Sequence, residues 1–330
     1  MQHLLETHNL TKHFTASSFF RREQKVVHAV DDVNIQIEVG ETLGLAGESG
    51  CGKSTLGRTL IQLMEPTSGE VLFRGKNLRG LRKDEIKEFR RKVSIVCQDP
   101  LGALNPRRTI LQSLAQPFQI HTSMSQSQIH ENVTRLLDIV GLSPAGLYID
   151  RLPHEFSGGQ RQRVNIARAI SLNPEFVVAD EPVSALDLSV RAQILNLLRE
   201  LQKKLNITYL FITHDLSVLR SLSDRTAIMY LGKIVELARA DDLYLNPIHP
   251  YTRAILSATP VPDPKTHRKR ILLTGDVPSP TKPPPGCRFH TRCWAREGIC
   301  SKEEPVLTDT GNTHHVACHV ELRKLGISTK

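Results

Sequence analysis

The fold is decided by the stretch Gly47-Glu48-Ser49-Gly50-Cys51-Gly52-Lys53-Ser54-Thr55. An apolar run, residues 43–46, precedes it, and a run compatible with a helix follows from Leu56 to Met64. Glycines at the spacing Gly-x4-Gly-Lys-Ser let the backbone curl until successive N–H groups point inward at a phosphate chain. A glycine-rich surface turn is the alternative, but the strand-to-helix context favours a phosphate-binding loop.

The polar side chains of this loop indicate a polyphosphate ligand with a magnesium ion. Lys53 is expected to reach the β and γ oxygens, and Ser54 to offer its hydroxyl to Mg²⁺. The helix that begins here would direct the positive end of its dipole at the anion. The predicted nucleotide-binding residues of the loop are Gly47, Ser49, Gly50, Cys51, Gly52, Lys53, Ser54 and Thr55.

Length and composition limit the interpretation. The 330 residues can hold two domains, or one large α/β domain with an appendage, and the net charge is +9. No stretch approaches the ~18 consecutive apolar residues of a membrane-spanning helix, and the N-terminus lacks the apolar core of a signal peptide. We expect a chain that stays in the reducing cytoplasm. The positive charge is interpreted as a solvated basic surface, since no nucleic-acid-binding module accompanies it.

Two alternating stretches near the N-terminus predict an antiparallel sheet. Apolar and polar residues alternate from Leu5 to Phe14 and again from Val26 to Val39, most regularly toward Val39. The intervening residues from Thr15 to Lys25 are polar and basic apart from Phe19-Phe20. We interpret them as an exposed loop without chemical function.

Apolar strands then alternate with a long helical region. Strands are predicted at residues 70–73, 93–97, 176–179 and 208–213, and helices near 110–114, 129–140, 164–172 and 189–205. The first three helical stretches predict a helical subdomain inserted into an α/β sheet. From Pro247 onward lie 11 of the 19 prolines, and regular periodicity fades. This composition predicts a separate, loop-rich appendage.

Polar residues follow directly after four of the predicted strands, at Gly47, Gln98, Asp180 and His214. In open α/β sheets ligands bind at the carboxyl ends of strands, so we predict that these four positions converge. Asp180 would help to hold Mg²⁺, Glu181 would accept a proton from the attacking water or orient it, and His214 would hydrogen-bond the γ-phosphate. Taken alone, Glu181 is more simply a surface acid and His214 a core histidine. Together with the phosphate-binding loop, they indicate phosphoryl transfer.

A second potential phosphate site lies at Ser157-Gly158-Gly159-Gln160, which opens another helix. Ser157 is a candidate N-cap, and the glycines free backbone donors for an anion. Because this helix belongs to the inserted subdomain, one chain cannot easily bring it onto its own phosphate-binding loop. We therefore expect a second subunit to supply the nucleotide.

Six ordered motifs resemble those of ABC-transporter ATPases over about residues 5–245. They are the phosphate-binding loop, Gln98, Ser157–Gln160, Asp180-Glu181, Ser184-Ala185-Leu186-Asp187 and His214. The resemblance implies a head-to-tail dimer that hydrolyses ATP, and a P-loop (RecA-like) α/β fold with an antiparallel β subdomain. It assigns the core to residues 1–100 and 174–245, an inserted α-helical signature subdomain to 101–173, and a Pro/Cys-rich C-terminal domain to 246–330.

The resemblance also implies roles for individual residues. The implied Mg²⁺ ligands are Ser54, Gln98 and Asp180. The implied catalytic residues are Glu181 as base, His214 as switch histidine, and Lys53. Ser157, Gly158, Gly159 and Gln160 would close over the partner's ATP, and Asp187 would lie near the dimer seam. Phe14 is the candidate for stacking on adenine, although an ordinary core phenylalanine gives the same pattern.

Further stretches resemble the ATPases of bacterial dipeptide and oligopeptide importers, most closely the dipeptide-type second ATPase. They are Gln98-Asp99-Pro100, Leu104-Asn105-Pro106, residues 246–252 and the cysteine tail. The implied partners are a second ATPase subunit, expected to be a paralogue in a heterodimer, two membrane permease subunits and indirectly a periplasmic peptide-binding protein, at the cytoplasmic face of the inner membrane. Relatives that handle nickel, glutathione, haem or antimicrobial peptides leave the cargo open.

Two other classes of function are weighed. A soluble ABC ATPase acting on nucleic acid or ribosomes is favoured only by the basic charge, and the long coiled coils or paired cassettes of such proteins are not found in this sequence. A non-catalytic nucleotide-binding partner is disfavoured by the intact Lys53, Asp180, Glu181 and His214. We therefore predict an active transport ATPase that does not bind nucleic acid.

Four of the six cysteines lie in the tail, at Cys287, Cys293, Cys300 and Cys318. Their spacings, x5, x6 and x17, lack the C-x2-C pairs of most zinc folds, and the cytoplasm disfavours disulfides. A metal clip is expected, with zinc or free thiols as alternatives. Resemblance to the peptide-importer tails implies a [4Fe-4S] cluster, with Zn²⁺ as the second choice.

Overall fold

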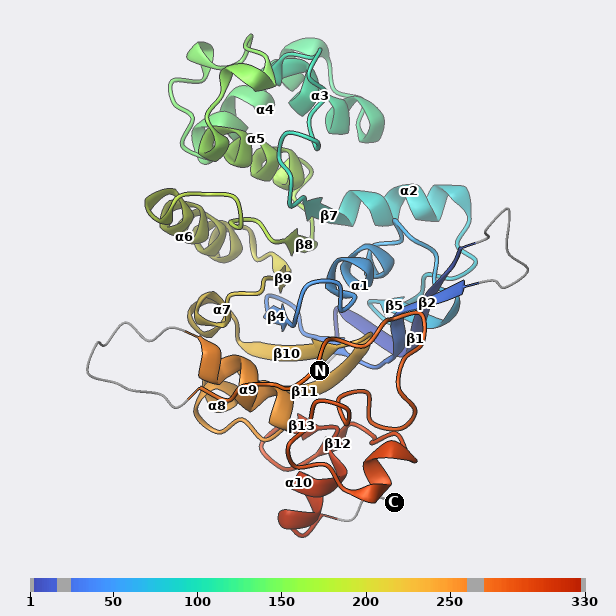
Figure 1. Cartoon of the computed structure of the whole chain (residues 1–330). Helices are drawn as coiled ribbons and strands as arrows, with labels where there is room; N and C mark the ends of the chain where they lie inside the picture. Colours follow the sequence, from blue (N-terminus) through green and yellow to red (C-terminus); the bar gives the residue numbers. More distant parts are fainter. Residues whose placement is uncertain (1–2, 17–24, 260–269, 328–330) are drawn as a thin grey trace. The chain divides into compact units, whose positions relative to one another are not determined.

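The structure, a computed structural model, describes residues 3–16, 25–259 and 270–327 (Figure 1). Those within Met1–Glu38, Thr42–Arg79 and Ile212–Lys330 form one compact unit. Those within Val39–Glu41 and Gly80–Phe211 form a second unit. In the described part of the chain, no helix has the combination of length and apolar character that a membrane crossing requires.

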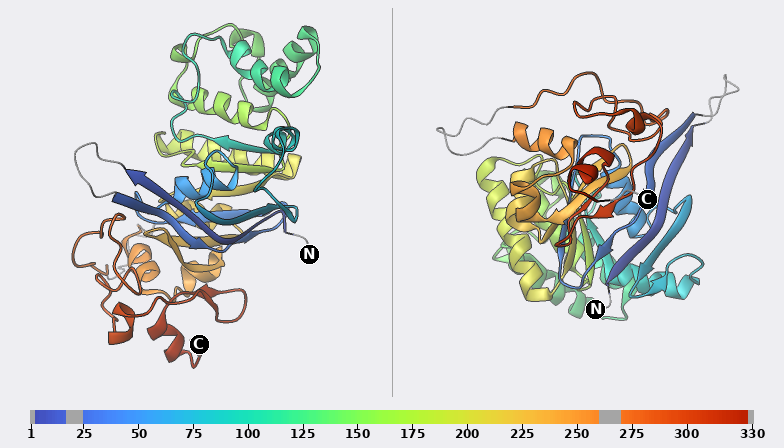
Figure 2. Two further views of the ribbon diagram at one scale, coloured as in Figure 1. Left: turned by 90° about the vertical axis from the view of Figure 1, so that its right-hand side faces the viewer. Right: turned by 90° about the horizontal axis from the view of Figure 1, so that it is seen from below.

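The first unit begins with the antiparallel sheet that the alternating sequence predicts. Its strands are β1 (Leu5–Ala16), β2 (Lys25–Val33), β3 (Gln36–Ile37), β5 (Ser68–Phe73) and β6 (Lys76–Asn77). The order is β2-β1-β5-β6, and β3 also pairs with β1. Both views of Figure 2 show β1 and β2 as a long pair of neighbouring strands.

The predicted loop from Thr15 to Lys25 is shorter at both ends than the sequence indicates. β1 continues two residues beyond Phe14, to Ala16, and β2 already includes Lys25. The remaining residues, 17–24, contain Phe19-Phe20 and lie outside the described residues.

The regular alternation toward Val39 does not produce one continuous strand. β2 ends at Val33, and only the two residues of β3 pair again with β1. At the break, the hydroxyl of Thr7 donates to the carbonyl of Val33 and accepts from the N–H of Ile35. A side chain therefore interrupts the backbone ladder that the alternation alone would continue.

A second sheet of the first unit carries the phosphate-binding loop. Its strands, in spatial order, are β12 (Thr308–Asp309), β13 (His315–Val316), β11 (Lys233–Arg239), β10 (Arg225–Tyr230) and β4 (Thr42–Ala46). β10 is parallel to β4, and the other pairs are antiparallel. All five residues of β4 are buried, as in a central strand.

Helices α1 (Lys53–Leu60), α7 (Leu216–Leu222), α8 (Ala240–Leu245), α9 (Pro250–Ala258) and α10 (His319–Lys324) complete this unit. Of these, α1 is the helix predicted after the phosphate-binding loop. It ends at Leu60 rather than Met64, and Gln62 takes a left-handed backbone conformation with φ 55°. This conformation is typical of residues that follow a helix C-terminus.

The residues after Asn246, the C-terminal segment, are more regular than their composition predicts. They contribute α9, α10, a 3₁₀ helix at Gly298–Ser301 and strands β12 and β13, and β13 extends the sheet by pairing with β11. The buried ring of Phe289 holds them to the sheet, with its centroid 5.3 Å from that of Tyr230 and 5.4 Å from that of Tyr251. The proline-rich composition hides this attachment because a single ring and a two-residue strand leave no periodic pattern in the sequence.

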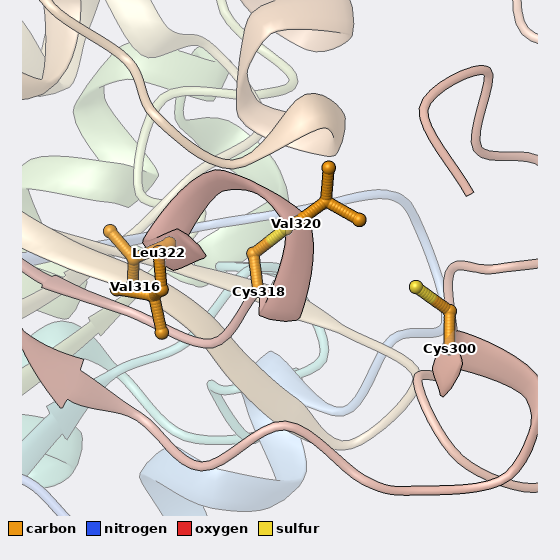
Figure 3. Packing of buried hydrophobic residues seen from close by; sticks show 5 residues of the cluster. All are labelled: Cys300, Val316, Cys318, Val320 and Leu322. Carbon is orange, nitrogen blue, oxygen red and sulfur yellow. The ribbon is translucent and has the colours of Figure 1, made fainter. Parts of the chain in front are cut away.

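A smaller apolar cluster stabilises the end of the chain (Figure 3). It consists of Cys300, Val316, Cys318, Val320 and Leu322. In Figure 3, Cys300 comes from a different stretch of chain than the other four. The cluster thus connects the 3₁₀ helix with β13 and α10.

The second unit combines three strands with a group of helices. The strands are β9 (Thr208–Ile212), β8 (Phe176–Asp180) and β7 (Val93–Val96), in that order. The helices are α2 (Lys83–Lys92), α3 (Ile110–His121), α4 (Gln126–Ile139), α5 (Gly158–Ile170) and α6 (Leu188–Leu205). α3 to α5 confirm the three predicted helical stretches, and each is longer than predicted. The domain boundaries at residues 100, 173 and 245 stay predictions.

Truncation of the buried aromatic ring should destabilise the first unit. We expect Phe289→Ala to lower the free energy of unfolding by about 3–5 kcal/mol, because the cavity between Tyr230 and Tyr251 cannot close fully. Trp294→Ala is the control, since Trp294 lies in the same segment with half of its surface exposed; its cost should stay near or below about 1 kcal/mol. Urea unfolding followed by circular dichroism measures both, and equal losses would contradict this account of the attachment.

Candidate functional site

The phosphate-binding loop runs from the end of β4 to the start of α1 in the first unit. Gly52 is the N-cap of α1 and has φ 112°. A Cβ atom at Gly52 would collide with the carbonyl oxygen of Ala29 on β2, and one at Gly47 would collide with the carbonyl oxygen of Met229 on β10. The backbone of the loop therefore touches two strands at positions that only glycine can occupy.

The ammonium group of Lys53 is buried within the curve of the loop. Its Nζ donates to the carbonyl oxygens of Gly47 and Glu48, at 2.8 and 2.9 Å. A positive charge is thus held within the loop that the sequence predicts to bind phosphate. Burial raises the pKa of the neighbouring Cys51 thiol, although Lys53 opposes this shift. The Cys51 thiol therefore stays neutral.

Two contacts to the loop come from residues that sequence reasoning missed. Tyr251 accepts a hydrogen bond from the backbone N–H of Glu48, at 2.9 Å. The guanidinium of Arg292 donates to the carboxylate of Glu48, at 2.9 Å. Both residues lie more than 200 positions from Glu48, and no local pattern in the sequence signals contacts over such a separation.

Phe14 and His214 are both too exposed to be the core residues that the alternative interpretations assume. Phe14 lies on β1 opposite Val27 and is 37% exposed, so it is not an ordinary core phenylalanine. The ammonium of Lys12 lies 5.2 Å from the centre of its ring. His214 follows β9 and is exposed, which contradicts the alternative of a core histidine. The stacking of Phe14 on adenine and the γ-phosphate contact of His214 stay predictions.

In the second unit, the structure brings Gln98 and Glu181 together. Gln98 follows β7, and its Nε2 donates to Oε2 of Glu181 at 3.3 Å. Asp180 is the buried last residue of β8, and Glu181 next to it adopts a left-handed conformation with φ 45°. The convergence of these strand ends with Gly47 and His214 stays a prediction.

The predicted N-cap at Ser157 is confirmed. The hydroxyl of Ser157 accepts from the N–H of Gln160, and Oε1 of Gln160 accepts from the N–H of Ser157, which makes a capping box at the start of α5. Gly159 packs tightly against Val190 of α6, where a Cβ atom would lie 2.5 Å from Cγ1. Ser157 and Asp187, the N-cap of α6, are exposed, so both can be reached by another subunit.

The four tail cysteines line one small cavity in the first unit. Three histidines, His249, His290 and His319, also line it. Burial raises the pKa of Cys287 to about 12 and that of Cys318 to about 11, and in both cases a neighbouring cysteine contributes to the shift. Within residues 3–16, 25–259 and 270–327, no three of these sulfurs lie within 4.8 Å of one another.

A different group, His13, His28 and Asp31, brings three potential metal ligands within 4.8 Å. Sequence reasoning missed it because His13 and His28 lie on neighbouring strands. The guanidinium of Arg288 is hydrogen-bonded to the carboxylate of Asp31 and already supplies a cation there. We therefore assign no metal to this group.

Comparison with known proteins relates this chain to transport ATPases. Residues 30–184 match the ABC transporter family, and residues 235–300 match the C-terminal region of oligopeptide/dipeptide transporters. The chain is 49% identical to the oligopeptide transport ATP-binding protein AppF of Bacillus subtilis, over 96% of this chain and 97% of that protein. It is 47% identical to the dipeptide transport ATP-binding protein DppF of Escherichia coli, over 96% of this chain and 94% of that protein.

Solved structures give the same relationship for the fold. A dimeric post-hydrolysis state of the ATP-binding cassette MJ0796, bound to ADP and phosphate, matches with a TM-score of 0.64. The two sequences are 30% identical, and the match covers 72% of this chain and 98% of the MJ0796 chain. CbiO1 of Clostridium perfringens, part of the transporter complex cbiONQ, matches with a TM-score of 0.63 at 26% identity, over 74% of this chain and 92% of that chain.

Alanine substitutions at two loop glycines should separate the energetic cost of a strained backbone from that of a collision between Cβ and a neighbouring strand. Gly50 (φ 77°) and Gly52 (φ 112°) both have left-handed backbones, but a Cβ atom at Gly50 meets open space. Gly50→Ala should therefore cost about 1–2 kcal/mol of conformational strain, whereas Gly52→Ala must also displace Ala29 and should cost clearly more. Urea unfolding without nucleotide measures both. Equal losses would show that the contact with β2 does not constrain the loop.

Proposed function

Since this chain belongs to the ATP-binding subunits of the oligopeptide and dipeptide ABC transporters, we propose that it hydrolyses ATP to drive the import of dipeptides or oligopeptides. The observation that carries this proposal is the phosphate-binding loop. Gly47 and Gly52 have no room for side chains, and the buried Lys53 holds a positive charge within the curve of the loop. Such a loop suits the phosphates of a nucleotide.

Ser54, Gln98 and Asp180 are the proposed ligands of the magnesium ion that accompanies ATP. Hydroxyl, amide and carboxylate oxygens are hard ligands of the kind Mg²⁺ prefers. When bound, the ion neutralises negative charge on the phosphates. Glu181 is the proposed general base, and its hydrogen bond to Gln98 supports this role by orienting the carboxylate. His214 would hydrogen-bond the γ-phosphate, and Phe14 would stack on the adenine.

Ser157, Gly158, Gly159 and Gln160 are proposed to bind the nucleotide of a second ATPase subunit. The capping box leaves N–H groups of the first turn of α5 directed out of the helix, where an anion can accept from them. The exposure of Ser157 and Asp187 supports a role at a dimer seam. The dimer MJ0796 shows that a similar cassette pairs with a second copy; for this chain, a paralogous subunit is the proposed partner.

Two membrane permease subunits and, indirectly, a periplasmic peptide-binding protein complete the proposed transporter. The similarity to AppF and DppF over 96% of this chain supports transport rather than action on nucleic acid or ribosomes. The chain would lie at the cytoplasmic face of the bacterial inner membrane, bound to the permeases. Closure of the ATPase dimer on ATP would then be coupled to peptide uptake, and hydrolysis would reopen the dimer.

The four tail cysteines are proposed to hold a [4Fe-4S] cluster. All four line one cavity, which suits a shared metal group. Tetrahedral zinc keeps its ligand sulfurs at ~2.3 Å from the metal and hence roughly 4 Å from one another. In the described residues no three of the sulfurs lie within 4.8 Å of one another, and a cluster, which places several iron atoms between the sulfurs, fits such an arrangement better. When bound, the cluster would cross-link the C-terminal segment through bonds between iron and the cysteine sulfurs.

Replacement of the proposed base tests the ATPase function. Glu181→Gln should retain ATP binding but lose hydrolysis by ~10²-fold or more, because the amide keeps the shape of the side chain but cannot accept the proton. Phosphate release and equilibrium nucleotide binding measure the two properties. Glu200→Gln, which changes an exposed acid on α6, should leave both unchanged. Wild-type turnover in Glu181→Gln would refute the assignment.

Metal analysis of the anaerobically purified chain tests the cluster. We expect roughly four irons per chain and charge-transfer absorbance near ~400 nm. Cys293→Ser should lose the iron, whereas Cys97→Ser, which removes a thiol outside the tail, should retain it. Zinc without iron in the wild-type chain would contradict the cluster and show that the cysteines bind Zn²⁺ instead.

A further inference from the structure

Two side chains of the C-terminal segment bind the phosphate-binding loop at a single residue, Glu48. Nη1 of Arg292 donates to both carboxylate oxygens of Glu48, at 3.2 and 2.9 Å, and Nη2 donates to one of them at 3.3 Å. The hydroxyl of Tyr251 accepts from the backbone N–H of Glu48 at 2.9 Å. The side chain and the backbone of one loop residue are thus both fixed from outside the loop.

We propose that Arg292 and Tyr251 are positioning residues for nucleotide binding, so that the C-terminal segment forms part of the ATP site. This inference rests on the proposed binding of ATP at the phosphate-binding loop. The hydrogen bond to Tyr251 holds the N–H of Glu48, and the pair with Arg292 fixes the direction of the side chain. The start of the loop, from which the predicted phosphate-binding residues follow, is thereby anchored.

The ion pair is sheltered enough to restrain the loop. The side chain of Arg292 is 9% exposed and that of Glu48 is 29% exposed. A two-pronged guanidinium–carboxylate pair in such a setting is stronger and more directional than a pair on the open surface. Arg292 also donates to the hydroxyl of Tyr230 at 3.4 Å, so the guanidinium has a second fixed partner besides Glu48.

Aromatic packing holds both positioning residues in place. The ring of Tyr251 lies 4.7 Å from that of Tyr230, and both contact the ring of Phe289. The carbonyl of Phe289 accepts from the N–H of Arg292 at 3.0 Å, which makes a tight turn between them. Arg292 therefore approaches Glu48 from a backbone that the buried core fixes, rather than from a mobile surface loop.

Arg292→Gln in the full-length chain tests the proposal. We expect the dissociation constant for the fluorescent analogue TNP-ATP to rise about tenfold, because an uncharged side chain cannot restrain the Glu48 carboxylate as an ion pair does. Arg292→Lys keeps the positive charge but cannot donate two parallel hydrogen bonds to the carboxylate, so it should give an intermediate dissociation constant. Arg323→Gln is the matched control, since it removes an ion pair of the same segment in which Arg323 is 61% and Glu297 44% exposed; it should bind like the wild type.

The double variant Glu48→Gln/Arg292→Gln separates positioning from a general loss of stability. If the pair acts as a unit, the double variant should bind no more weakly than the weaker single variant. Additive losses, or wild-type affinity in folded Arg292→Gln, would overturn the proposal. If Arg292→Gln does not fold, Glu48→Gln alone decides, because it breaks the same pair without altering the C-terminal segment. Failure of the wild type to bind TNP-ATP would instead overturn the proposed function.

Discussion

The close approach of the phosphate-binding loop to two strands is the constraint on which the first unit depends. At Gly52 the loop touches the carbonyl of Ala29 on β2, and at Gly47 that of Met229 on β10. A third link is the hydrogen bond from the N–H of Gly232 to the carbonyl of Cys51, at 2.8 Å. The curve of the loop is therefore set by backbones from two distant parts of the sequence, β2 and residues 229–232, and the glycines permit these contacts.

Features with a local cause were predictable from the sequence. The N-cap of α5 depends on Ser157 and Gln160, which are three residues apart, and its hydrogen bonds form within one turn. The buried strand β8 was visible because residues 176–179 are continuously apolar, and Asp180 follows directly. In both cases, short-range chemistry determines the structure. Gln98 and Glu181 lie 83 positions apart, and their hydrogen bond agrees with the rule that parallel strands bring their carboxyl ends to one edge.

Features that depend on distant partners could not be predicted. The break between β2 and β3 is caused by the hydroxyl of Thr7, which lies 28 positions from Ile35. The contacts of Tyr251 and Arg292 with Glu48 span 203 and 244 positions. Composition was misleading for the C-terminal segment, since many prolines indicate loops but do not exclude one well-buried aromatic ring. Phe289 supplies that ring, and a single residue leaves no periodic signal.

A buried carboxylate explains why the C-terminal segment docks on β11 in particular. Glu236 is fully buried, and such a charge is costly unless hydrogen bonds satisfy it. Its oxygens accept from the backbone N–H groups of Ile248 and His249, at 2.7 and 3.0 Å, and Nε2 of His314 lies 2.7 Å away.

These partners all belong to the segment that follows β11, so the strand and the segment stabilise each other. Burial lowers the pKa of His249 to about 4, so this ring is neutral at physiological pH and its Nδ1 accepts from the N–H of Tyr251 at 3.1 Å. The hydrogen bonds that satisfy Glu236 therefore also orient the backbone of Tyr251. Because the hydroxyl of Tyr251 accepts from the N–H of Glu48, Tyr251 links the buried carboxylate of Glu236 to the backbone of the phosphate-binding loop.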